Sequence, residues 1–192
     1  MAETALLDLP RFKGRPGWEF TELGDFTLEA WEPAPANGTA FDAAHLLEPP
    51  AGSIELVQVD GATTEGSSDG LTVLPLSVAR ERHPDLVEPH LGTIVRDVDA
   101  FTALNESGWE GGAFVHVPAG VVVDAPILLT AVTSTPGTIL NRRVLIVLEE
   151  GAEAEVWEQY VSDRESSSSS SASHTTFERE PVAPLATSSS PR

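Results

Sequence analysis

The middle of the chain alternates hydrophobic with polar residues, and this period of two predicts β-strands. One strand is expected in SIELVQVDG at 53–61, and a shorter one in LTVLPL at 71–76, where Pro75 indicates the edge of a sheet. Beyond Gly111, the stretch GGAFVHVPAGVVVDAPILL predicts further strands separated by tight turns. These expected strands cover 113–117, 121–123 and 127–132. The pattern therefore predicts a mainly β protein.

The strand pattern is repeated further along the chain. The stretch RRVLIVLEEGAEAEVWEQYVS again places a strand, a glycine-containing turn and a strand in that order. A shift of 31 residues superimposes Val115, Val117 and Gly120 on Ile146, Leu148 and Gly151. Two copies at a fixed spacing indicate the rungs of a β-solenoid, in which each rung is covered only by the next. Two rungs are too few for a finished solenoid.

Short helices and an irregular arm are expected before these rungs. Hydrophobic residues at helical spacing predict helices near 84–91 and 98–107. Asp97 or Asp99 is the expected N-cap of the second helix, and Gly108 is its expected end. The first 35 residues are punctuated by proline and glycine, and their large aromatic residues are expected to dock this arm onto a core. These anchors are Trp18, Phe20, Phe26 and Trp31.

The composition divides the chain into three parts. An N-terminal arm and α+β region covers 1–110, the first rungs cover 111–164, and a Ser/Pro-rich tail covers 165–192. The tail is predicted to be disordered, because it cannot bury enough apolar surface to offset the entropy lost on ordering. The change near Glu165 is abrupt, so both a natural tail and an interrupted or frame-shifted gene stay open as explanations.

Charge and composition exclude several classes of function. A formal net charge of −19 argues against a nucleic-acid-binding protein, which needs clustered lysine and arginine. With no cysteine, the chain has no disulfide, thiolate nucleophile or sulfur-ligated metal. The first residues do not form a secretory signal, and no apolar run approaches the ~20 residues that span a bilayer. We therefore expect a cytoplasmic protein.

Histidine and arginine are the first candidates for chemistry. As a metal ligand, His116 would need partners, but His90 and Asp124 show no ligand spacing, so a surface or packed histidine is expected. A cupin is rejected, because its metal motif needs a second histidine in this stretch. The pair Arg142–Arg143 could hold an anion, but a solvated strand edge paired with Glu149–Glu150 is the preferred interpretation. No phosphate-binding loop of the GxxxxGK type is present.

The acidic residues give no convincing catalytic pair. Asp97, Asp99 and Glu106 do not converge on one face of a helix, and capping explains Asp97 or Asp99. The run EEGAEAE is expected to form a solvated turn and outward strand positions. The residues therefore predict no catalytic, cofactor-binding or metal site.

A family resemblance lies in HLGTIVRDVDAFTALNESGWEGGAFVHVPAGVVVDAPILL. This segment closely resembles the SufB/SufD family of iron–sulfur cluster assembly proteins, and its SufD members in particular. GRPGWEFTEL at 14–23 resembles the Pro-x-Trp-Glu element near the family's N-terminus, and NRRVLIVLEEGAEAEVWEQYVS resembles its next rungs. The likeness covers roughly Pro10 to Arg164.

The resemblance implies a right-handed parallel β-helix flanked by helical segments. It also implies a scaffold without enzymatic activity of its own, which pairs with SufB and is driven by the ATPase SufC in building iron–sulfur clusters. The family's assembly residues, SufB–SufD contact strands and SufC-binding helices lie later in the chain, so no family site residue is carried onto this sequence. We therefore expect a truncated SufD-like portion that binds no cofactor itself and lacks the contact regions for its SufB-like and SufC-like partners.

Two alternatives stay open. The first is a truncated product without activity, whose uncovered last rung causes self-association. The second is a small β-helix enzyme that acts on polysaccharide and holds a cation on surface carboxylates. Such enzymes usually carry an export signal and clustered aspartate and arginine, and the sequence shows neither.

Overall fold

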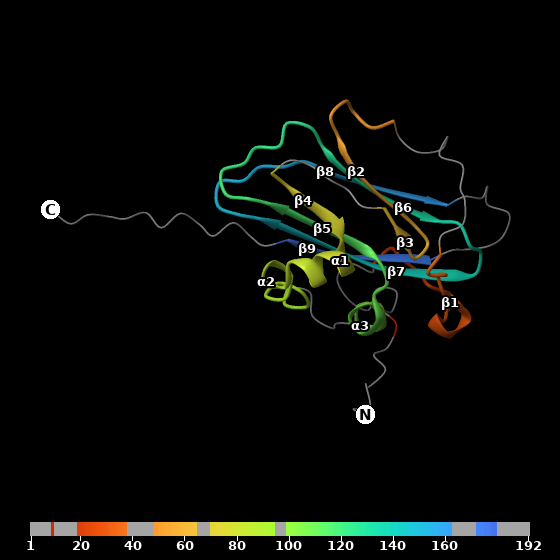
Figure 1. The fold of residues 1–192 in the computed structure, drawn as a ribbon. Helices are drawn as coiled ribbons and strands as arrows, with labels where there is room; N and C mark the ends of the chain where they lie inside the picture. Colours follow the sequence, from red (N-terminus) through yellow and green to blue (C-terminus); the bar gives the residue numbers. More distant parts are fainter. Residues whose placement is uncertain are drawn as a thin grey trace.

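Two β-sheets lie against each other in the computed structural model of the chain (Figure 1). The described residues are 9, 19–37, 48–64, 70–94 and 99–162, together with the backbone of 172–179. The first sheet has the order β1 (Glu32–Pro33), β7 (Thr138–Leu148), β5 (Gly112–Val117) and β4 (Thr72–Pro75), and β9 (Ala172–Arg179) also pairs with β7. The second sheet has the order β3 (Ala62–Thr63), β2 (Ile54–Val59), β6 (Ile127–Thr133) and β8 (Val156–Ser162). A mainly β protein with short helices is thereby confirmed.

From β5 onward the chain passes alternately through the two sheets, and successive passes through one sheet pair in parallel. Strand β5 pairs with β7, with Val115 opposite Ile146, and β6 pairs with β8, with Ile127 opposite Val156. Between the sheets, the Gly120 amide donates to the Glu150 carbonyl at 3.0 Å, so the turns are stacked as well. Residues 112–133 and 138–162 therefore form two layers, and the predicted shift of 31 residues is confirmed at β5 and β7.

Apolar side chains fill the space between the sheets. They come from alternate positions of the strands, and they are Leu56, Val73, Ala113, Val115, Val117, Ile127, Leu129 and Val144. Alternation follows from the pleat of a strand, which sends successive side chains to opposite faces. Burying each of the larger aliphatic side chains contributes roughly 1.5–3 kcal/mol, so this cluster holds the sheets together.

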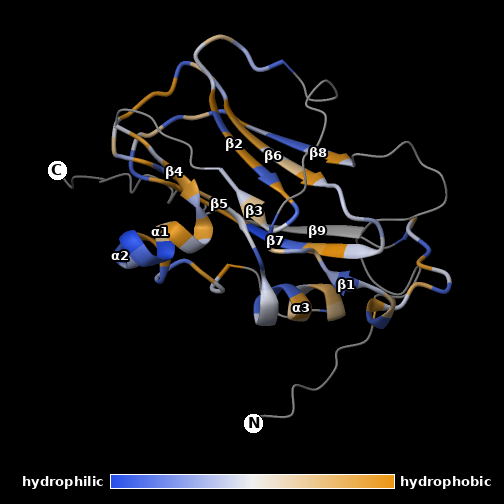
Figure 2. Cartoon of the chain, turned by 45° about the vertical axis from the view of Figure 1, so that its right-hand side comes forward, coloured by the Kyte–Doolittle hydropathy of each residue, from blue (hydrophilic) through white to orange (hydrophobic). Residues whose placement is uncertain are grey.

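The other face of the first sheet is covered by helices. Helices α1 (Leu76–Arg82) and α2 (Pro84–Val87) pack on Phe114, Leu145 and Val147. Both faces of β5 are thus buried, which explains its continuous run of buried residues. Figure 2 shows the hydrophobic start of α1 next to the sheet.

The helical segments differ from the prediction in detail. The predicted strand at 71–76 is β4, which lies at the edge of its sheet as Pro75 indicated, but the chain then turns directly into α1, which was not predicted. The predicted helix near 84–91 ends at Val87 and continues as turns. The predicted helix near 98–107 is α3 (Ala100–Gly108). Within the described residues, no helix is long and apolar enough to cross a membrane.

The N-terminal arm docks through part of its predicted anchors. Phe26 lies 5.9 Å from Trp31 and 5.8 Å from Phe101 between ring centroids, beside the short helix η1 (Leu28–Ala30). Phe20 is 96% exposed, so its prediction as an anchor is wrong, because no core surface lies beside it among the described residues. Trp18 lies outside the described residues.

The tail prediction needs one correction. Residues 172–179 were predicted to be disordered, but they form β9, which pairs in parallel with β7 from Ile139 to Ile146. An open strand edge offers main-chain hydrogen bonds to any sequence, so a Ser-rich composition does not prevent pairing. The rest of 165–192 lies outside the described residues. The boundary near residue 110 stays a prediction, although β2 and β4 lie in the same sheets as the later strands.

Candidate functional site

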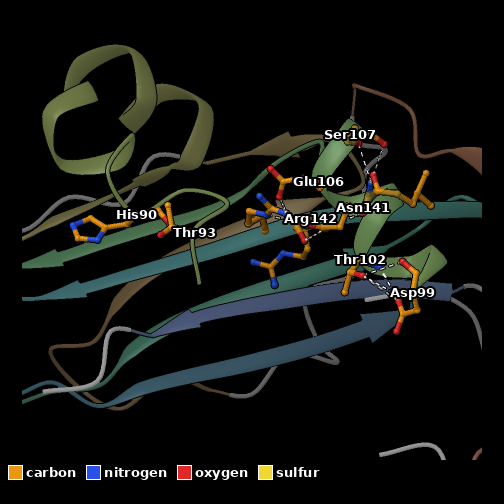
Figure 3. Close-up of polar contacts among 12 residues, drawn as sticks. His90, Thr93, Asp99, Thr102, Glu106, Ser107, Asn141 and Arg142 are labelled. Atoms are coloured by element: carbon orange, nitrogen blue, oxygen red, sulfur yellow. Dashed lines mark hydrogen bonds and ion pairs between the residues drawn. The ribbon is translucent and has the colours of Figure 1, made fainter. Parts of the chain in front are cut away.

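A buried polar network joins α3 to β7 (Figure 3). The Asn105 side chain donates to Asn141 Oδ1 at 2.8 Å and to the Arg142 carbonyl at 2.9 Å. In return, Asn141 Nδ2 donates to the carbonyls of Leu104 and Gly108, at 3.0 and 2.9 Å. The ALN segment of the sequence therefore has a structural role, since its asparagine, Asn105, fixes α3 to β7.

Arg143 points toward the same helix and is almost completely buried. Its Nη2 lies 2.7 Å from Glu106 Oε2, and its Nε donates to Asn105 Oδ1 at 2.8 Å. Glu106 also reaches the loop before α3, because a Cβ added to Gly92 would lie 2.7 Å from its Oε1. The Glu106 carboxylate thus pairs with Arg143 of the sheet and lies close to this loop.

Arg142 points in the opposite direction, between the two sheets. It is fully buried, its Nε donates to Gln58 Oε1 at 3.2 Å, and its guanidinium carbon lies 5.6 Å from the centre of the Tyr160 ring. Nη1 and Nη2 have no hydrogen-bond acceptor. Burial lowers the pKa of the Arg142 guanidinium, while the nearby Tyr160 and Glu158 act in the opposite direction. The prediction of a solvated Arg142–Arg143 edge paired with Glu149–Glu150 is therefore wrong.

Gln58 connects Arg142 to the start of β5. Its Oε1 accepts a hydrogen bond from the Gly112 amide at 2.9 Å, and its Nε2 donates to the Asp60 carbonyl at 2.8 Å. At Gly112 the chain has a φ of +108°, and an added Cβ would lie 1.8 Å from the Arg143 carbonyl oxygen. The second glycine of the GG pair is therefore required by the close approach of the two layers.

The last strand of the second sheet carries a second polar group. On β8, the Tyr160 hydroxyl donates to Glu158 Oε2, whereas the buried Oε1 of Glu158 has no donor. Burial raises the pKa of the Glu158 carboxyl, and the Tyr160 hydroxyl and Arg142 partly offset this effect. Trp157 and Tyr160 are large side chains that remain 37% and 44% exposed. This strand combines exposed aromatic area with an incompletely satisfied carboxyl group.

His116 is a packed histidine, as predicted. It is 8% exposed, its ring is stacked on Phe114, and its Nε2 donates to Glu149 Oε1 at 2.8 Å. Glu149 Oε2 accepts from the Ala119 amide at 3.0 Å. These hydrogen bonds, the one from His116 first, lower the pKa of the Glu149 carboxyl. The pair holds the turn of the second layer against the end of β5.

Among the remaining acidic candidates, Asp99 has a structural role. Asp99 is the N-cap of α3, because its Oδ1 accepts from the Thr102 amide at 3.0 Å, so that prediction is confirmed. Asp97 lies outside the described residues. The described ranges contain no group of three histidine, aspartate or glutamate side chains that could hold a metal ion.

Long-range contacts explain what sequence reasoning missed. Gln58, Asn105 and Arg142 lie far apart in the sequence, and each alone is a common polar residue. The available signals were the ALN segment, the GG pair and the position of Gln58 on the apolar face of its strand. Chemically, the arrangement fixes the main chain of α3, β5 and β7.

Comparison with known proteins agrees with this description. The family described as the SufBD protein N-terminal region matches residues 58–129, which contain α3, β5 and the start of β6. An iron–sulfur cluster assembly SufBD family protein of Mycobacterium tuberculosis is 34% identical over 86 residues, which are 44% of this chain and 10% of the relative. The iron–sulfur cluster assembly protein SufD of Bacillus subtilis is 37% identical over 89 residues, 45% of this chain and 20% of that protein. SufB of the same organism is 28% identical over 86 residues, 44% of this chain and 18% of SufB.

These matches confirm the resemblance to the SufB/SufD family, in its N-terminal region. The matched segment spans only a tenth to a fifth of these relatives. The family match at 58–129 ends within β6, in the first of the two layers, and includes Gln58 and Asn105 but not their partners on β7.

Proposed function

From this SufBD N-terminal region we infer that the chain acts in iron–sulfur cluster assembly, as a SufD-like scaffold that works by protein association. The observation that carries the proposal is the match of residues 58–129 together with the identity of 37% to a SufD and 28% to a SufB. We place this scaffold in the cytoplasm, with SufB-like and SufC-like proteins as its partners. It carries no catalytic activity and no resident cofactor of its own.

The architecture that supports this role is the start of a right-handed parallel β-helix. The two parallel layers, their stacked turns and the spacing of 31 residues between Val115 and Ile146 support this interpretation. In such a solenoid, each layer needs only its neighbours, so a short stack can present a rigid surface. The polar network around Arg142 and Arg143 then fixes the register of the layers and the position of α3.

Co-purification tests the proposed function. The full chain, tagged at one end, is expressed together with a SufB-like and a SufC-like protein, and the captured partners are identified by mass spectrometry. We expect both partners to be retained in amounts comparable to the bait. The comparison variant is Asn105→Ala, which loosens α3 but leaves every charge in place. We expect this variant to retain less of each partner than the unchanged chain. Loss of both partners together with aggregation of the intact chain would contradict the scaffold role and favour an inactive product.

A further inference from the structure

Residues 32–36 of the N-terminal arm form a strap beside the start of β7. The strap contains β1, in which Pro33 lies opposite Ile139 in a parallel pair. The Ala34 amide donates to the Ile139 carbonyl at 2.9 Å, and the Glu32 amide donates to the Gly137 carbonyl at 3.3 Å. These main-chain contacts join the arm to the first sheet.

Little apolar surface holds the strap in place. Among the described arm residues 19–37, Ala34 is the only one that is buried, and it packs on Ala131 and Leu140. By contrast, every residue of the neighbouring β6 is buried. A segment with few buried apolar contacts opens at a lower free energy than the core strands beside it. The strap is therefore less firmly held than the layers on which it lies.

The arm has a separate attachment before the strap. Phe26 contacts the rings of Trp31 and Phe101, so the chain is held to α3 just ahead of Glu32. This contact does not involve the hydrogen bonds of the strap. A strap that leaves β7 therefore stays tethered next to its place, and it can close again without a search.

Two consecutive amides at the end of β2 mark the border between the stacked layers and the strap. The Asp60 amide donates to the Val132 carbonyl at 2.8 Å, whereas the Gly61 amide donates to the Pro35 carbonyl at 2.9 Å. Asp60 is fully buried, and its carboxylate accepts from the Ser134 amide at 2.9 Å. Asp60 thus belongs to the layers, and the hydrogen bond of Gly61 belongs to the strap.

We propose that the strap opens and closes independently of the stacked layers. Opening separates Ala34 from Ile139 and Pro35 from Gly61, and it uncovers part of Leu140, which is otherwise fully buried. The strap thereby controls access to one end of the apolar space between the sheets. This conformational device goes beyond the scaffold function proposed above and does not depend on it.

Hydrogen exchange of the intact chain tests the proposal at single amides. Exchange is followed by NMR under conditions in which each rate reports the opening equilibrium, and the rates are corrected for the intrinsic exchange of each residue. We expect similar protection at Ala34 and Gly61, and exchange at both at least about a hundredfold faster than at Asp60. Equal protection at Gly61 and Asp60 would overturn the proposal, because the strap would then open only together with the layers.

Two variants push the strap open from different sides. In Gly61→Ala the added Cβ would lie 2.8 Å from the Pro35 carbonyl oxygen and from the Ala36 α-carbon, so exchange at Ala34 should rise at least about tenfold while Asp60 is unchanged. The matched control is Gly108→Ala, where no atom lies within 4 Å of the added Cβ and no change is expected.

Ala34→Gly removes only the buried methyl group of the strap, and it keeps the test usable if Gly61→Ala does not fold. We expect faster exchange at Gly61 in this variant and an unchanged rate at Asp60. Unchanged exchange at Gly61 would overturn the proposal. Exchange that rises equally at Gly61 and Asp60 would also overturn it, because the strap would then be an inseparable part of the layers.

Discussion

At the scale of single residues, Gly112 and Gln58 control how closely the two layers approach. The Gly112 amide donates to Gln58, and its α-carbon lies opposite Arg143 with no room for a side chain. Arg142 and Arg143 then leave β7 in opposite directions, one toward Gln58 and one toward α3. These buried polar contacts thus connect β2, β5 and α3 to β7.

Replacing Gly112 by alanine is predicted to destabilise the fold severely. The new Cβ would lie 1.8 Å from a carbonyl oxygen at a φ of +108°, so the layers must separate, and the free energy of unfolding should fall by about 3 kcal/mol or more. The matched control is Gly120→Ala, where φ is +71° and no atom lies within 4 Å of the added Cβ, and the expected loss is about 1 kcal/mol. Urea unfolding measures the free energy of unfolding of both variants. Similar losses in the two variants would contradict the close approach of Gly112 to Arg143.

The Glu149 carboxyl is predicted to make stability depend on pH in the acid range. Because hydrogen bonds from His116 and from the Ala119 amide lower its pKa below the ordinary 4.5, the folded state is stabilised above that pH. This stabilisation is lost as the pH falls through the lowered value. NMR titration of the carboxyl carbon should show the lowered pKa, and His116→Phe should move it back toward 4.5. A Glu149 pKa that does not respond to His116→Phe would contradict this account.

At the scale of elements, helix α3 is held to β7 mainly by polar contacts. Asn105 bonds to Asn141 and Arg143 and to the Arg142 carbonyl, whereas the outer side of the helix ends in solvent-exposed residues such as Ser107. Buried polar groups without partners cost roughly 1–3 kcal/mol each, so the network is sensitive to the loss of one member. The docking of α3 therefore depends on Asn105 more than on its apolar contacts.

Asn105→Ala is predicted to release α3 before the sheets are affected. The substitution removes the bonds to Asn141 and Arg143, and the free energy of unfolding should fall by about 2–3 kcal/mol. Hydrogen exchange should show lower protection across Ala100–Gly108 and unchanged protection in β6. The control is Ser107→Ala on the same helix, whose exposed hydroxyl donates to the Leu104 carbonyl, with an expected change near zero. Equal effects of both variants would contradict a central role for Asn105.

The elements that the sequence predicted well are those with a strong local pattern. Strands β2, β5, β6 and β8 follow the alternation of apolar residues, and Asp99 caps α3 as its position indicated. Helix α1 was missed, because the apolar residues after Pro75 continue the strand pattern for one more position. Strand β9 was missed, because its pairing depends on the edge of β7 and not on its own composition.

The candidate site was less predictable than the strands. Two arginines next to two glutamates in sequence suggested a solvated edge, but Glu149 instead bonds to His116 and Ala119, and both arginines are buried. The hydrogen-bond partners of Arg142 and Arg143 in β2 and α3 are 37 to 84 residues away along the chain. Only the stacking of the layers brings these groups together.

At the scale of the whole molecule, the described chain is a short stack of layers in two sheets, with helices on one side. The turn segments between the two sheets are stacked as well. The Val123 amide donates to the Glu153 carbonyl, and the Glu153 amide donates to the Val121 carbonyl, both at 2.9 Å. Val122 and Glu153 therefore lie opposite one another in an isolated parallel bridge between the two turn segments. A scaffold function depends on this stacking, since it makes the surface rigid.

A cysteine pair at this point tests the stacking most directly, because the chain has no cysteine of its own. The variant Val122→Cys with Glu153→Cys places two thiols on the opposite residues of this parallel bridge, within the Cα separation that a disulfide requires. Oxidation of the dilute protein, followed by mass spectrometry, should show a disulfide within the chain for most molecules. Val122→Cys with Glu155→Cys, two residues out of register, should remain mostly reduced. Equal cross-linking of the two variants, or none in either, would contradict the stacked layers on which the proposed function rests.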